Sequence, residues 1–158
     1  MKRNINLVPF SHDHHQGLIF ALRLKKGIAK AAAPDVLKKY ILGYWEVDLH
    51  HHFFEEERLL LPHLEANHPL TVRFKLDHQS VREAVQAIAE LDDERIIGWA
   101  EKLSNQIERH IRFEERELFP FMEEEVSQKE LRKIGEGLAG HKEVCYAFKP
   151  EFWKPTQS

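Results

Sequence analysis

Two stretches of the chain nearly repeat one another: HFFEEERLLLPHL at residues 52–64 and HIRFEERELFPFM at residues 110–122. Each begins with a histidine, carries a glutamate four positions later, and has a proline six positions after that glutamate. Residues four apart lie on the same face of an α-helix, with about 5–6 Å between their Cβ atoms. Each stretch therefore predicts a helix that presents an imidazole and a carboxylate side by side.

A second, shorter pair of stretches also begins with histidine: HQGLIFAL at residues 15–22 and HQSVREAV at residues 78–85. The later apolar positions of the two stretches match as well. Four histidines and two glutamates thus recur in a two-fold pattern. This pattern predicts one metal site built symmetrically from four helices.

The composition is that of a soluble globular protein, and we expect one domain spanning residues 1–158. Hydrophobic residues make up 42% of the chain and charged residues 31%, which is ordinary for this class. The net charge of −3 argues against a nucleic-acid partner, and the lack of a long apolar run argues against a membrane. A single cysteine, Cys145, excludes an internal disulfide. These features predict a cytoplasmic protein.

The chain shows helix signals throughout and no period-2 alternation or hairpin turn, so the predicted fold class is all-α. Four long helices are expected at about residues 11–30, 35–66, 70–91 and 94–126, with N-caps at Ser11 and at Asp92-Asp93. Ser127 starts a capping box for a short fifth helix. Short loops make neighbouring helices antiparallel. The prediction is an up-down-up-down four-helix bundle, about residues 11–126, followed by a C-terminal helix and an irregular tail, residues 127–158.

In such a bundle the repeated histidines fall at one height. His15 and His52 are equidistant from the turn at residues 31–35, and His78 and His110 are equidistant from the turn at residues 92–95. Residues equidistant from a turn lie side by side in an antiparallel helix pair. The same histidines also lie on apolar stripes that must face the core. Because buried imidazoles and carboxylates need compensation, a metal is expected there.

Four imidazoles and two carboxylates exceed what one tetrahedral zinc ion uses, and they suit two metal ions. Nitrogen and oxygen ligands without a thiolate favour iron. The expected cofactor is therefore a pair of iron ions, for which zinc or manganese are possible substitutes.

The two HxxxEE…P motifs and the accompanying histidines resemble the hemerythrin-like, or HHE cation-binding, family over about residues 10–125. The resemblance implies a four-helix bundle that holds a non-haem diiron centre of the oxygen-bridged type. Carried over position by position, it implies six metal ligands: His15, His52, Glu56, His78, His110 and Glu114.

The chain departs from the oxygen-carrying members of that family at two positions. Phe74 stands where they have an additional histidine, four residues before the third-helix ligand. Their last carboxylate is an aspartate five residues after the histidine; here that place is Glu115, next to the better-placed Glu114. The chain therefore offers fewer protein ligands than an oxygen carrier has, and this argues against simple reversible oxygen carriage.

Other histidines and glutamates remain alternatives. His14 is adjacent to His15, and the match of the two HQ stretches favours His15. His12 and His141 are possible additional ligands whose simpler interpretation is a surface position, and Glu57 and Glu115 are reserve ligands. His50, His51 and His68 are expected at the surface. His63 lies on the ligand stripe but too far along the helix to reach the same metal site.

The expected function is that of a diiron protein that binds or senses oxygen or nitric oxide, or handles iron. A diiron enzyme, such as a peroxidase, an oxidase or a factor resembling iron–sulfur cluster repair proteins, is the alternative. A zinc-bound or metal-free structural bundle is the third interpretation. The open coordination positions are expected in a pocket walled by Phe53, Phe113 and the residues near Gly17, with Ser80 as the repeat equivalent of Gly17.

Overall fold

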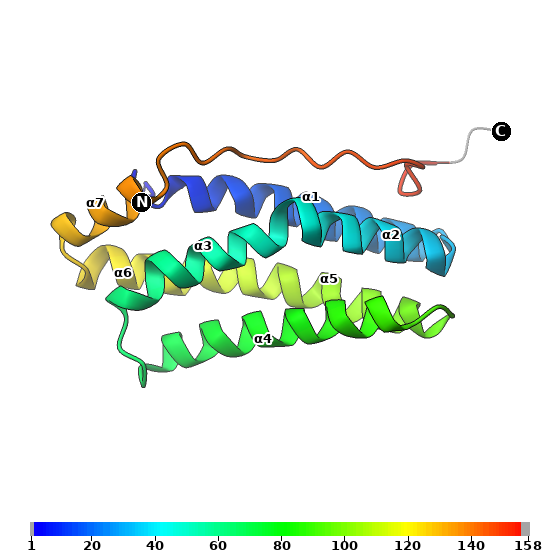
Figure 1. Ribbon diagram of the computed structural model, residues 1–158, viewed down its shortest axis with the longest axis horizontal. Helices are drawn as coiled ribbons and strands as arrows, with labels where there is room; N and C mark the ends of the chain where they lie inside the picture. Colours follow the sequence, from blue (N-terminus) through cyan, green and yellow to red (C-terminus); the bar gives the residue numbers. More distant parts are fainter. Residues whose placement is uncertain (1, 156–158) are drawn as a thin grey trace.

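The computed structural model describes residues 2–155, which form a bundle of four antiparallel helical rods (Figure 1). This arrangement confirms the predicted all-α fold. Two of the rods are single helices, and two contain a π-helical turn. No helix within the described residues is both long and apolar enough to cross a bilayer. In chain order the elements are α1 (Val8–Ala29); α2 (Pro34–Tyr44), η1 (Trp45–Leu49), α3 (His50–Leu60) and η2 (Leu61–His63); α4 (Pro69–Glu90); α5 (Arg95–Phe113), η3 (Glu114–Leu118) and α6 (Phe119–Glu125); and α7 (Gln128–Gly137).

The N-termini of the first and fourth rods differ from the sequence-based expectation. Helix α1 begins at Val8, three residues early, and its N-cap makes no side-chain hydrogen bond. The hydroxyl of Ser11 instead donates to Glu115, at 2.8 Å from Oε2. The fourth rod begins at Arg95, whose backbone N–H donates to Asp93. Ser11, which the local sequence predicts as an N-cap, therefore makes a tertiary hydrogen bond instead.

Two other helix ends follow their local sequence more closely. The second rod leaves α-helical geometry after Leu60 and closes with the 3-10 turn η2, which contains Pro62, so it stops short of residue 66. Proline lacks the N–H that would continue the α-helical ladder. Ser127 is confirmed as the N-cap of α7, since its hydroxyl accepts a hydrogen bond from the backbone N–H of Glu130 at 3.1 Å.

Apolar side chains form two clusters within the bundle. The larger lies toward the α1–α2 and α4–α5 turns and includes Phe20, Tyr40 and Leu103. The smaller lies toward α6 and α7 and includes Phe10 and Phe119. Burial of each such side chain contributes about 1.5–3 kcal/mol. A layer of buried histidine, aspartate and glutamate side chains lies along the rods between residues that belong to these two clusters.

The C-terminal tail, residues 139–155, runs in an extended path along α1 and α2 (Figure 1). The hydroxyl of Tyr146 donates to the backbone carbonyl of Tyr40 at 3.0 Å. Trp153 is buried, and the guanidinium of Arg23 lies 4.5 Å from the centre of its ring. The predicted irregular tail is thus confirmed for these residues, while residues 156–158 lie outside the described part of the chain.

Candidate metal centre

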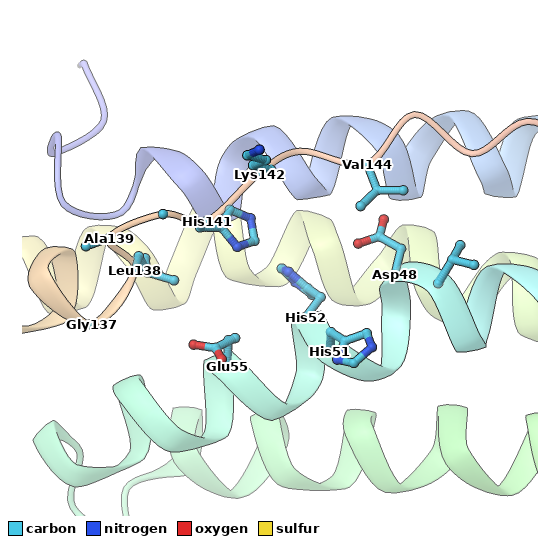
Figure 2. Close-up of a pocket in the computed structure, with 12 residues that line it drawn as sticks. Asp48, His51, His52, Glu55, Gly137, Leu138, Ala139, His141, Lys142 and Val144 are labelled. Atoms are coloured by element: carbon cyan, nitrogen blue, oxygen red, sulfur yellow. The ribbon is translucent and has the colours of Figure 1, made fainter.

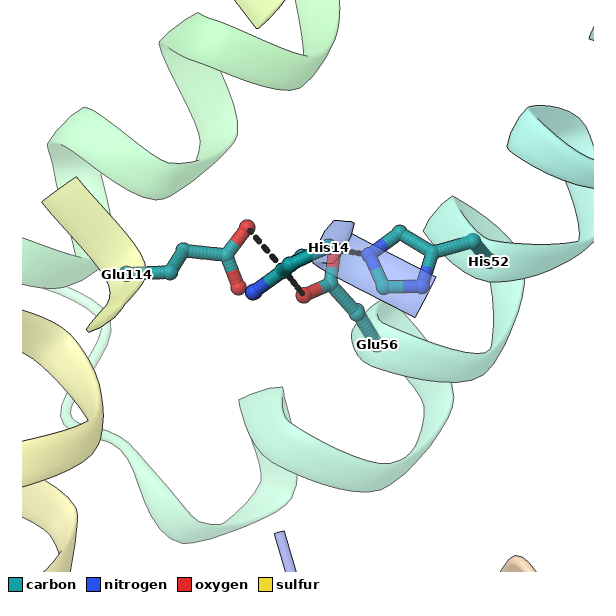
Figure 3. A group of neighbouring side chains, drawn as sticks. All are labelled: His14, His52, Glu56 and Glu114. Atoms are coloured by element: carbon teal, nitrogen blue, oxygen red, sulfur yellow. Dashed lines mark ion pairs between the residues drawn. The ribbon is translucent and has the colours of Figure 1, made fainter. Parts of the chain in front are cut away.

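Six buried side chains from all four rods meet at one level of the bundle. They form two overlapping groups, and within each group one ligand-type atom per residue lies within 4.8 Å of the others. Glu56 and Glu114 belong to both groups. Figure 3 shows the first group, with the His14 ring between the two carboxylates. The first group is His14, His52, Glu56 and Glu114; the second is Glu56, His78, His110 and Glu114.

The Nε2 atoms of the four histidines all face the two glutamates. Nε2 of His52 lies 3.1 Å and Nε2 of His78 lies 3.2 Å from the same oxygen, Oε1 of Glu56. Nε2 of His14 lies 3.5 Å from Oε2 of Glu56 and 3.7 Å from Oε1 of Glu114. Nε2 of His110 contacts Oε1 of Glu114. The predicted height and facing of these helices therefore bring five of the six expected side chains together.

His15, the sixth expected residue, lies outside this cluster. Its side chain is exposed, whereas the neighbouring His14 is buried and occupies the expected position. The expectation rested on matching the dipeptide His15-Gln16 to His78-Gln79. The structure instead aligns Asp13-His14 with Asp77-His78, because one additional histidine stands before the glutamine in the first helix. A one-residue shift turns a helical side chain by about 100°.

Each of the four Nδ1 atoms bonds to a carboxylate. The distances are 2.7 Å from His14 to Glu115, 2.9 Å from His52 to Asp13, 2.7 Å from His78 to Glu57, and 3.0 Å from His110 to Asp77. An ionised carboxylate only accepts hydrogen bonds, so each Nδ1–H is the donor. This arrangement fixes the tautomer of a neutral imidazole and leaves the Nε2 lone pair directed into the cluster, as metal-ligating histidines require.

Each half of the chain, rods one and two or rods three and four, supplies orienting carboxylates both to its own histidines and to those of the other half. The aspartate that holds a histidine of the second or fourth rod comes from the same half, as in Asp13 with His52. The glutamate that holds a histidine of the first or third rod comes from the opposite half, as in Glu57 with His78. Glu57 and Glu115, named above as reserve ligands, therefore orient histidines and do not point into the cluster.

Several atoms at the centre of the cluster have no hydrogen-bond partner among the described residues. Both carboxylate oxygens of Glu56, both of Glu114, and Nε2 of His14 are in this state, and all are fully buried. An unsatisfied buried polar atom costs about 1–3 kcal/mol, and more for a charged group. A nitrogen- and oxygen-lined cluster whose only unmade bonds point inward fits metal ions.

Comparison with protein families agrees with this geometry. A family model for the hemerythrin HHE cation-binding domain matches residues 4–122, three quarters of the chain. The chain belongs to the hemerythrin HHE family. Comparison with curated proteins and with solved structures finds no significant match to either. The matched segment contains every residue of the cluster, whereas α7 and the tail lie beyond it.

Without metal, three groups of the cluster bind protons more tightly than they do in water. Burial opposes protonation of His110, but the charge of Glu114 and the bond to Asp77 raise the pKa of His110 to about 10. Burial likewise opposes protonation of His52, and Glu56 and Asp13 nevertheless raise its pKa well above the ordinary value. Burial and the adjacent Glu56 raise the pKa of Glu114. Metal entry must therefore displace protons from this HHE cluster.

A small cavity of about 10 Å³ adjoins the histidines on one side of the cluster. This volume is close to the minimum for a single water molecule. Burial and the nearby Asp13 raise the pKa of Asp48, in its wall, to about 6. The cavity is lined by His14, His52, His110 and Asp13 together with Gly17, Tyr44, Asp48, Leu49, Phe53, Ile107 and Ile111.

The position of this inner cavity corrects two expectations. Phe53 lines it, as expected, but Phe113 does not. Ser80 is not equivalent to Gly17, because the alignment of the two Asp-His pairs places Gly17 opposite Val81. The Val81 side chain is fully buried and occupies the corresponding place in the second half. Glycine at position 17, where the equivalent position in the second half has Val81, explains why space opens beside α1.

A larger pocket of about 320 Å³ lies outside the inner cavity, between η1–α3 and residues 137–144 (Figure 2). The two spaces share Asp48 and His52 in their walls. His141 reaches from the tail into this region, and its Nε2 donates to Oδ1 of Asp13 at 2.9 Å. The simple surface role expected for His141 is therefore wrong.

The remaining histidines stay away from the cluster. His68 caps α4 by accepting a hydrogen bond from the backbone N–H of Leu70, and His63 pairs with Glu130. Like that of His15, the side chains of His12, His50 and His51 are exposed.

Sequence reasoning missed the two aspartates that orient His52 and His110, and it missed Tyr44 and Asp48 at the inner cavity. The aspartates carry a signal, since each directly precedes a cluster histidine in an Asp-His pair. Tyr44 and Asp48 lie at the edge and inside of the π-helical turn η1, which the sequence pattern does not reveal. Such turns occur frequently at functional sites.

Proposed function

We propose that the chain binds two metal ions, as a diiron centre, which would be held by His14, His52, His78 and His110 together with Glu56 and Glu114, the two residues common to both groups of ligand-type atoms. The observation that carries the proposal is the set of four Nδ1–carboxylate bonds, which direct four Nε2 atoms at two buried carboxylates without hydrogen-bond partners. Zinc or manganese would fit the same donor types.

The proposed ligand is a diatomic molecule, oxygen or nitric oxide, that the protein binds or senses; a role in handling iron uses the same residues. When bound, a redox-active metal pair would supply the electrons for chemistry on such a molecule. The chain supplies a space beside three of the histidines that is too small for a larger substrate. Phe53, Ile107 and Ile111 keep this space apolar and limit access of water.

Entry from solvent is proposed through the outer pocket under the tail. Asp48 and His52 separate this pocket from the inner cavity. Oxygen or nitric oxide would need only small side-chain movements there, whereas a bulky reductant would be held outside.

Anaerobic purification followed by elemental analysis and an oxygen-titrated optical spectrum tests the proposal. The expected result is two iron ions per chain and charge-transfer bands that appear with oxygen. A protein that contains one metal ion or none after reconstitution with ferrous iron would contradict it.

An enzyme acting on peroxide or another small oxidant is the second candidate. It is favoured by Tyr44 and Asp48, two groups able to carry a proton, in the wall of a cavity that is otherwise mostly apolar. Burial and the nearby Asp48 raise the pKa of Tyr44 well above its ordinary value, so its hydroxyl stays protonated at neutral pH. Turnover of peroxide or nitric oxide by the iron-loaded protein, lost in Tyr44→Phe, would favour this candidate over binding alone.

A further inference from the structure

Another pocket, lined only by polar residues, lies between α4 and α5, on the outer side of His110. It has a volume of about 220 Å³ and is lined by Arg73, Asp77, Ser80, Gln106 and Arg109. None of these residues belongs to the metal cluster. Asp77 nevertheless joins the two sites, because its Oδ2 accepts the hydrogen bond from Nδ1 of His110.

Hydrogen-bond donors in this pocket outnumber their protein acceptors. The guanidinium of Arg109 is exposed and makes no ion pair or hydrogen bond to any residue between positions 2 and 155. The guanidinium of Arg73 stacks on the Phe113 ring, 4.3 Å from its centre, and makes only long contacts to carboxylates, 3.3 Å to Glu117 and 3.7 Å to Asp77. Two guanidinium groups with free N–H donors attract an oxyanion, which they can bind in a bidentate manner.

The pocket also contains acceptors to which a ligand can donate. Oε1 of Gln106 is buried and has no hydrogen-bond partner among the described residues. Asp77 places a carboxylate in the same wall, and only one of its oxygens is taken by His110. A ligand that fits must therefore accept hydrogen bonds from Arg109 and Ser80 and donate at least one of its own. A fully deprotonated anion would leave the buried Oε1 of Gln106 unsatisfied.

We propose that this pocket binds phosphate in a form that keeps a P–OH group. At neutral pH inorganic phosphate retains at least one acidic proton, whereas sulfate has none. The anionic oxygens of phosphate lie against Arg109 and Arg73, and its P–OH donates to Oε1 of Gln106 or to Asp77. Because Asp77 also holds His110, occupancy of this pocket is expected to alter the environment of a histidine in the metal cluster.

Isothermal titration of inorganic phosphate, with sulfate at matched ionic strength, tests the proposal on the purified full chain. The expected result is saturable phosphate binding with a Kd of roughly millimolar or tighter, and sulfate binding at least tenfold weaker. Arg109→Gln, which removes a donor, and Gln106→Met, which removes the buried acceptor, should each weaken phosphate binding by about tenfold or more.

Arg112→Gln is the matched control, since it removes the same charge from the same helix. Arg112 pairs with Glu108 and does not line the pocket. Equal losses in Arg109→Gln and Arg112→Gln would show general charge attraction and overturn the proposal, as would equal affinity for sulfate and phosphate, or no saturable binding. Arg109 is exposed, so its variant is expected to fold, which circular dichroism checks.

Discussion

Nε2 of His141 lies 2.9 Å from Oδ1 of Asp13, although 128 positions separate the two residues. The other oxygen of the same aspartate accepts from Nδ1 of His52. A residue of the tail, outside the segment matched to the HHE family, therefore contacts the carboxylate that orients a histidine of the cluster.

Asp13→Ala should lower metal affinity by about 10–100-fold, which is typical for loss of a carboxylate that orients a ligating histidine. His141→Ala should lower it less, because His52 keeps its bond to Asp13. Competition with a chromogenic chelator measures both effects. His63→Ala, which breaks a distant ion pair with Glu130, should leave the affinity unchanged. Wild-type affinity in Asp13→Ala would refute the assigned orienting role.

A histidine scan separates the cluster from its neighbours. His14→Ala, His52→Ala and His110→Ala should each lose most of the bound metal, because each removes an Nε2 donor from the buried cluster. His15→Ala and His50→Ala should retain it, since both side chains are exposed. Elemental analysis after identical iron loading decides. Metal loss in His15→Ala together with full occupancy in His14→Ala would reverse the ligand assignment.

Removal of the metal should destabilise the fold. The buried oxygens of Glu56 and Glu114 and Nε2 of His14 would return to the unsatisfied state. Binding to the native state alone adds about 4 kcal/mol at a free metal concentration 1,000 times the Kd. Calorimetry of iron-loaded and chelator-treated protein should show a clearly higher Tm for the loaded form. Equal values would argue against a buried site.

The metal-free protein should lose stability as the pH rises from about 6.5 to about 10. The pKa of His110 is raised to about 10 in the fold, so its protonated form stabilises the native state fully below the unfolded value of about 6.5 and progressively less above it. The raised pKa of His52 acts in the same direction.

The iron-loaded protein should instead lose stability as the pH falls below neutral, because acid protonates the Nε2 atoms and releases metal. Urea unfolding of the metal-free form at about pH 7 and about pH 9.5, and of the loaded form at about pH 5 and about pH 7, measures both dependences, with metal-free His110→Gln as control. A metal-free protein that gains stability over this range would contradict the assignment of His110 as a proton-holding group.

Gly17→Ala should impair binding of azide or nitric oxide without loss of metal. A Cβ at Gly17 would lie 2.8 Å from Cδ1 of Ile111, within the small inner cavity. Gly17→Leu should block binding of azide or nitric oxide more completely. Gly98→Ala is the control, since its Cβ would have no neighbour within 4 Å. Optical titration with azide should show at least a tenfold weaker affinity for Gly17→Ala and an unchanged affinity for Gly98→Ala.

The bundle could be predicted because helix periodicity and turn residues act locally and agree with one another. The five correctly placed cluster residues follow from the same periodicity, since His52 with Glu56 and His110 with Glu114 are each one turn apart. The first-helix histidine could not be chosen with the HQ match alone. The buried face of α1 holds Phe10, His14 and Gly17, whereas Leu18 and Leu22 are exposed.

The surroundings of the site were less predictable because they depend on contacts between distant segments. Ser11 carries a normal N-cap signal, yet its hydroxyl bonds to Glu115 more than a hundred positions away. The tail signals only irregular structure, and nothing local in it places His141 against Asp13. The π-helical turns widen a helix by one residue, which a fixed period of 3.6 residues cannot register.

The exchange of orienting carboxylates between the two halves has a consequence for chain topology. The chain has one cysteine and hence no internal disulfide, yet His14 is held by Glu115 and His78 by Glu57. Two ions bound among these residues would tie all four rods together at mid-height, as a covalent cross-link does. They would restrict the unfolded chain wherever the ligands remain attached, and they would do so reversibly, under the control of metal supply.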